Sequence, residues 1–113
     1  MMDSLPKWLI EYLHILNNTG KEGEFQRSIF VAYAVALQEL GRDITCASIE
    51  DAIKSSTEVY KSYNDIIDRD PGVANVLNQI KGIDQADLEE LLMPAMKGLV
   101  IAEKTQHAID SNS

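Results

Sequence analysis

The sequence predicts an all-α protein, a bundle of four or five helices with a kink or a break at Pro94. Apolar residues recur every three or four positions over most of the 113 residues, which is the spacing of one face of an α-helix. No stretch alternates apolar and polar residues between hairpin turns, so strands are not favoured. Residues that cap or stop helices stand where this spacing begins and ends. We therefore expect residues 1–113 to form one helical domain, with only the last few residues free.

The first predicted helix lies near the N-terminus. Ser4 can cap it, and Pro6 suits its first turn, where no backbone donor is needed. Asn17, Asn18 and Gly20 end it. Its apolar stripe consists of Leu5, Trp8, Leu9, Tyr12, Leu13 and Leu16.

The second predicted helix covers residues 24–40 and is apolar on nearly every side. Gly41 ends it, because glycine tolerates the left-handed backbone conformation. A helix of this kind is buried either at the centre of its own bundle or against another chain. The sequence leaves both alternatives open.

A third helix is expected from a cap at Thr45 or Ser48 to the break at Asp70-Pro71-Gly72. Its apolar positions keep helical spacing throughout, and its other face is polar and charged. A short helix over residues 73–80 follows.

The last predicted helix opens with Asp84 as its cap and continues to the C-terminus. Pro94 interrupts the pattern, because its ring clashes with the carbonyl of Glu90 and removes one hydrogen bond. We expect a kink, or two helices that meet near Met93. The predicted inner face of this helix consists of Leu88, Leu91, Leu92, Ala95, Leu99, Ala102, Gln106 and Ile109.

Composition excludes several classes of function. Eighteen acidic and ten basic residues give a net charge of −8, which opposes direct binding to nucleic acid or to an anionic membrane. The longest apolar run, Ile29 to Leu37, has nine residues, whereas a membrane span needs about 20. No signal peptide is recognisable, and the single Cys46 cannot form an internal disulfide, so we expect a cytoplasmic protein.

Motifs for catalysis and for cofactors are missing. His14 and His107 have no histidine or cysteine three or four residues away, so no zinc site is expected. Neither a G-x-S-x-G elbow nor a glycine-rich phosphate loop is present. We predict no catalytic, cofactor-binding or metal-binding residues, and we expect that the protein is not an enzyme.

Two acidic clusters are the candidate partner-binding sites. Glu50, Asp51 and Glu58 share the polar face of the third predicted helix, while Asp87 and Glu90 lie near the start of the last one. Either cluster has a plainer interpretation, as a solvated face or as charge favoured at a helix N-terminus.

The function predicted from these observations is a small non-catalytic protein-protein interaction and regulatory module. It is expected to be a homodimer in which the second or the last helix supplies a helix-helix interface, with a protein partner that the sequence does not identify. The alternative is an acidic inhibitor or decoy that blocks a basic site on a nucleic-acid-handling partner. An apolar pocket beside Pro94, with Tyr33 and Gln106 as polar groups, is a further hypothesis.

Several segments together resemble a known helical family. They are residues 31–41 (VAYAVALQELG), 43–45 (DIT), 49–53 (IEDAI), 87–93 (DLEELLM) and 102–106 (AEKTQ). Within residues 25–106 the chain resembles the N-terminal domain of the stress-response phosphatase regulator RsbU and, in architecture, the C-terminal domain of the circadian protein KaiA. The resemblance implies a helical bundle that forms a homodimer and docks a regulatory partner without catalysis. Pro94 and the short helix over residues 73–80 depart from the family pattern.

Overall fold

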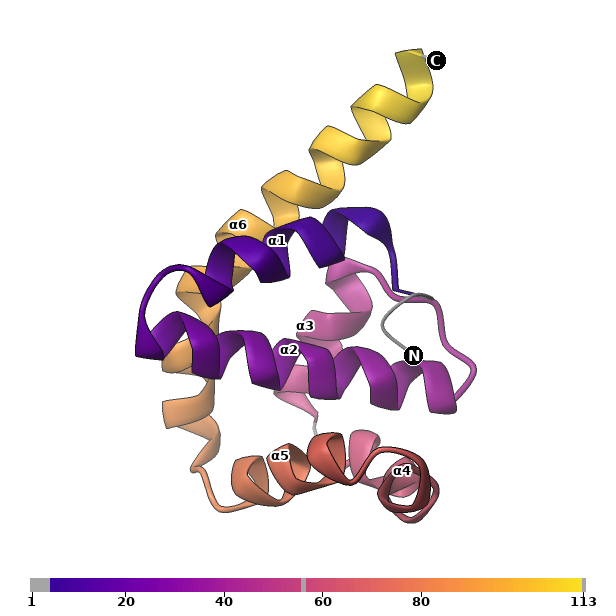
Figure 1. The fold of residues 1–113 in the computed structure, drawn as a ribbon, viewed down its shortest axis with the longest axis vertical. Coiled ribbons are helices and arrows are strands. Elements are labelled where there is room, and N and C mark those ends of the chain that lie inside the picture. Colours follow the sequence, from indigo (N-terminus) through magenta and orange to yellow (C-terminus); the bar gives the residue numbers. More distant parts are fainter. Residues whose placement is uncertain (1–4, 56, 113) are drawn as a thin grey trace.

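A computed structural model describes residues 5–55 and 57–112 of the chain. Within these ranges every regular element is helical and no β-strand is present (Figure 1), so the predicted all-α class is confirmed. In chain order the elements are α1 (Lys7–Asn17), α2 (Lys21–Glu39), α3 (Cys46–Lys54), the 3-10 helix η2 (Val59–Ser62), α4 (Tyr63–Arg69), α5 (Pro71–Lys81) and α6 (Gln85–Asn112). None of these helices is both long enough and apolar enough to span a membrane.

Helix α2 forms the centre of the bundle. Its apolar residues Ile29, Phe30 and Ala32 to Leu37 are at most 2 % exposed. Helices α1, α3 and α5 pack around it, with α1 and α5 on opposite sides in Figure 1. The apolar character of α2 on nearly every side is therefore accounted for by burial within its own bundle.

Helix α1 buries the stripe that its sequence predicts. Leu5, Trp8, Leu9, Leu13 and Leu16 are all buried, and Tyr12 is half-buried. Pro6 stands just before the helix, at its N-cap, whereas Ser4 lies outside the described residues. Gly20, with a φ of 92°, turns the chain into α2, which begins three residues earlier than predicted.

The single helix expected between Thr45 and Asp70 is wrong, because the structure divides it into α3, η2 and α4. The N-terminal cap is confirmed: Thr45 accepts a hydrogen bond from the backbone N–H of Ser48, whose side chain in turn accepts one from the N–H of Thr45. The helix ends at Lys54, with Ser55 as its C-cap. Serine favours caps and turns over helix interiors, because its side chain competes for backbone hydrogen bonds. After the break, Val59 and Ile66 both enter the core.

The predicted break at Asp70-Pro71-Gly72 is the start of α5. Asp70 caps this helix by accepting a hydrogen bond from the N–H of Val73 at 3.2 Å. Pro71 occupies the first turn, where its missing N–H costs nothing. The signals that end one helix here also begin the next.

Helix α6 continues through Pro94 without a break. Its axis changes direction between the orange and yellow parts of the ribbon in Figure 1, so a kink is observed rather than two helices. On α2, the buried Gln26 side chain donates a hydrogen bond to the carbonyl of Leu91 at 2.9 Å, close to the proline. Beyond the kink, the end of α6 projects past the other helices (Figure 1).

Candidate protein-interaction surface on helix α6

Most of the exposed large apolar side chains gather along α6. Among the described residues these side chains are Ile15, Ile67, Met93, Ile101 and Ile109. Three of them belong to α6, and Ile15 of α1 lines the same groove as Ile101 and Ile109. Ile101, Ile15 and Ile109 are 65 %, 60 % and 57 % exposed. Such clustering marks an interaction surface more often than scattered exposed residues do.

We call the first hollow on this surface the α1–α6 groove. Its volume is about 370 Å³, and its lining consists of Glu11, Tyr12, Ile15, Gly98, Ile101, Ala102, Thr105, Gln106 and Ile109. Glu11 is the one charged residue in this lining, and it comes from α1. The groove therefore suits an uncharged, apolar helix face.

Helix α1 is held close to α6 by Tyr12 and Gly98. The Tyr12 hydroxyl donates a hydrogen bond to the carbonyl of Ala95 at 2.7 Å. Its ring occupies the space beside Gly98, where an added Cβ would lie 2.5 Å from the Tyr12 hydroxyl oxygen. A glycine here permits the close approach that defines one wall of the groove.

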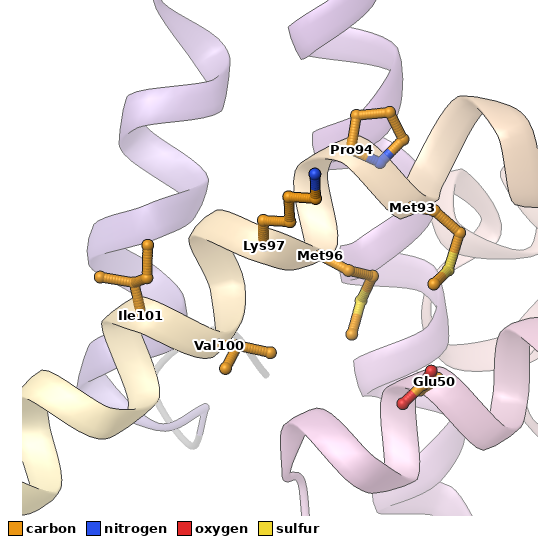
Figure 2. A pocket seen from close by; sticks show the side chains of 7 residues that line it. All are labelled: Glu50, Met93, Pro94, Met96, Lys97, Val100 and Ile101. Atoms are coloured by element: carbon orange, nitrogen blue, oxygen red, sulfur yellow. The ribbon is translucent and has the colours of Figure 1, made fainter.

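A second hollow, the α3–α6 hollow, lies on another side of α6 and has a volume of about 640 Å³. Its lining consists of Glu50, Met93, Pro94, Met96, Lys97, Val100 and Ile101. Figure 2 shows the side chains of Met93 and Met96 on the side of α6 that faces Glu50 of α3, while Lys97 points away from them. Methionines adapt to the shape of an apolar occupant, so the hollow can hold apolar side chains. Ile101 borders both hollows and joins them into one surface.

The pocket hypothesised beside Pro94 corresponds to this hollow, but its expected polar groups lie elsewhere. Gln106 lines the α1–α6 groove instead. Tyr33 is fully buried, and its hydroxyl has no hydrogen-bond partner among the described residues.

The acidic residues of the third predicted helix are separated in the structure. Glu50 is half-buried in the α3–α6 hollow and pairs with Lys54 at 3.3 Å. Asp51 and Glu58 line a different, smaller hollow that also contains Arg42. Partner binding by Glu50, Asp51 and Glu58 as one face is thus not supported by their placement, although it stays a prediction for each residue.

Glu58 already has cationic neighbours. Its carboxylate accepts a hydrogen bond from Lys61 at 2.9 Å and pairs with Arg42 at 3.0 Å. Lys61, followed by Arg42, holds the pKa of the Glu58 carboxyl below its usual range. Asp87 and Glu90 are exposed on the first turns of α6, before the apolar surface begins.

Cys46 is not arranged as a nucleophile. Its backbone N–H, at the start of α3, donates a hydrogen bond to the Glu103 carboxylate of α6 at 3.0 Å. Burial and then Glu103 raise the pKa of the Cys46 thiol to about 12, so the thiol is protonated at neutral pH. Over the described ranges, no group of three or more His, Cys, Asp or Glu side chains could hold a metal ion.

Sequence reasoning missed the isoleucines of this surface. Ile109 was expected on the inner face of the last helix. It is exposed, because α6 extends past the helices that could cover it. Ile15 and Ile101 are apolar residues outside the predicted apolar stripes, and this feature of the sequence could have identified them.

No protein-family model, curated protein or solved structure matches the chain. The resemblance to the RsbU and KaiA domains accordingly stays a prediction.

Proposed function

We propose that this protein is a small, non-catalytic interaction and regulatory module of the cytoplasm that forms a homodimer through the α1–α6 groove and the end of α6. The observation that carries the proposal is the group of three isoleucines, Ile15, Ile101 and Ile109, each more than half exposed around one groove. The sequence suggests the second or the last helix as the dimer interface. Because α2 is buried inside the bundle, the last helix is the remaining candidate.

The physical chemistry of this surface favours self-association. Removing apolar surface from water contributes about 25 cal/mol per Å². Charged residues of α6 are absent from the groove lining, so the net charge of −8 is not concentrated where two copies would meet. Association driven in this way depends little on salt, whereas an interface of ion pairs weakens as salt screens the charges.

The experiment is the molar mass in solution by light scattering, over a concentration series and at low and high salt. We expect a dimer at high concentration whose population is insensitive to salt. The variants Ile101→Lys and Ile109→Lys are expected to be monomers with an unchanged circular-dichroism spectrum, because both side chains are already exposed in the single chain.

Ile67→Lys is the matched control. Ile67 is also an exposed isoleucine, at 42 %, but it lies on α4, away from the groove. This variant should dimerise like the wild type. A wild-type monomer at every concentration, or an Ile101→Lys variant that still dimerises, would contradict the proposal.

A further inference from the structure

The exposed part of α6 carries the spacing of a helix-helix seam. Beyond Gly98, where the Tyr12 ring covers α6, the exposed residues Ile101, Thr105 and Ala108 follow one another at intervals of four and three residues. This alternation keeps one face of a helix against a partner helix. At about 100° per residue, Ile101 and Ile109 lie about 40° on either side of Thr105, so both point into the seam.

We infer that two copies pair through α6 in antiparallel orientation, with Thr105 next to the two-fold axis. This inference rests on the proposed homodimer and specifies its second copy. In this register, Ile101 of each copy lies at the same height along the helix pair as Ile109 of the other copy. A two-fold interface of this kind needs a self-complementary surface, and the pair of isoleucines around Thr105 provides one.

The position of α1 decides the orientation. Helix α1 covers α6 at Gly98, about 10 Å before Thr105 along the helix. In a parallel pair, the two Tyr12 rings would meet at the same level and hold the seam apart. In the antiparallel pair, the projecting end of each α6 lies beside α1 of the other copy and covers Ile15 there.

The charges are compatible with this arrangement. Lys97 and Lys104 lie about 80° and 100° from Thr105, on the side away from α1, which places them at the solvent-exposed rim of the seam. Glu11 remains the one charged residue in the groove lining. The seam itself is uncharged in both copies.

The contact area predicts a weak dimer. The part of α6 from Ile101 to its end, residues 101–112, is about 18 Å long, and its first turn contacts α3 through Glu103. Pairing one side of two such segments, with their α1 neighbours, buries on the order of 1,000 Å², the lower limit for a specific interface. The dimer should therefore form at micromolar or higher concentrations. Met93 and Val100 lie about 120° or more from Thr105, so pairing covers only the Ile101 edge of the α3–α6 hollow and leaves the rest of it open.

Disulfide cross-linking tests the register in the full-length chain, in a Cys46→Ala background. One sample contains Ile101→Cys, another Ile109→Cys, and a third an equal mixture in which one chain carries a tag that changes its mass. We expect at least about tenfold more cross-linked product in the mixture than in either variant alone, because a disulfide requires Cβ atoms about 4 Å apart. Thr105→Cys should cross-link to itself, and Ile67→Cys should not.

A second pair of cysteine variants keeps both isoleucines, so it tests the register even if replacing an isoleucine weakens the dimer. Ala102 and Ala108 are also level with each other, but they lie about 60° on either side of Thr105, so their Cβ atoms are about 8 Å apart. A bifunctional maleimide that spans about 8 Å should therefore link Ala102→Cys to Ala108→Cys in preference to linking either variant to itself. If Ile101→Cys or Ala102→Cys instead cross-links mainly to itself, the pair is parallel and the inference is overturned, while the proposed homodimer stands. A dimer by light scattering without cross-links at any of these positions also overturns the inference alone. A monomer by light scattering that does not cross-link through Thr105→Cys overturns both.

Discussion

Tyr33 is a buried polar group that its surroundings do not satisfy. The side chain is fully buried on α2, and its hydroxyl has no hydrogen-bond partner among the described residues. Burial, and then the nearby Tyr60, raise the pKa of the Tyr33 hydroxyl above its usual value. The hydroxyl loses its hydrogen bonds to water on folding and gains none from the protein, which costs stability.

Tyr33→Phe is therefore expected to raise the free energy of unfolding by about 1 kcal/mol, because it removes the unsatisfied hydroxyl and keeps the ring. Urea denaturation followed by circular dichroism measures the change. Tyr60→Phe is the matched control: the Tyr60 hydroxyl donates to the carbonyl of Leu77 at 2.9 Å, so this variant should lose about 1 kcal/mol. Equal losses in the two variants would show that Tyr33 also has a partner.

Cys46 makes the stability depend on alkaline pH. The thiol ionises near pH 9 in an unfolded chain, whereas in the folded protein its pKa is raised to about 12. Between these values the unfolded chain binds fewer protons than the folded one, so stability must fall as pH rises. We expect the free energy of unfolding to decline from about pH 9 toward pH 12.

Cys46→Ala isolates this contribution, because the raised pKa values of Tyr12, Tyr33 and Tyr60 act in the same direction in both proteins. Urea titrations at a series of pH values should show a shallower decline for the variant. Identical slopes would mean that the thiol ionises equally readily in both states.

At the scale of elements, the contact between α1 and α2 depends on a glycine inside a helix. Gly23 is buried in the first turns of α2, and a Cβ there would overlap the backbone carbonyl of Leu16 and the side chain of Thr19. A carbonyl at the end of α1 cannot move without displacing that helix. The short turn at Gly20 requires this close approach.

Gly23→Ala is expected to lower the free energy of unfolding by about 1–3 kcal/mol, although alanine is the better helix former. Thermal or urea unfolding measures the loss. Gly82→Ala is the control, because a Cβ at Gly82 would meet its nearest neighbour, the carbonyl of Gln79, at an ordinary 3.6 Å. Its stability should stay within about 0.5 kcal/mol of the wild type. A neutral Gly23→Ala would show that α1 can shift.

Contacts between residues close in the sequence explain which helix ends can be predicted. Thr45 and Asp70 cap their helices through contacts three residues away, so the cap can be read from the neighbouring sequence. The break after Lys54 could not be read in this way, because helical spacing of apolar residues continues across it. The break lets η2 and α4 turn so that both Val59 and Ile66 reach the core.

At the scale of the whole molecule, α6 is longer than the bundle that covers it. Its 28 residues correspond to about 42 Å, and the longest extent of the molecule is 41 Å. Beyond the α1–α6 groove, the end of α6 projects past the other described helices, and Ile109 remains exposed (Figure 1). The proposed dimer gives this end of α6 a neighbour, namely the same segment and α1 of a second copy.

The sequence by itself determined the helical class, the cap at Thr45 and the apolar stripe of α1, because hydrogen bonds within a helix and its apolar spacing are local properties. The tertiary structure decided whether α2 faces its own bundle or another chain, since that depends on which helices surround it. It also decided that Ile109 is exposed, although its spacing matches the core residues of α6. An apolar residue is buried only where another element reaches it, and the reach of those elements is set by how the whole chain packs.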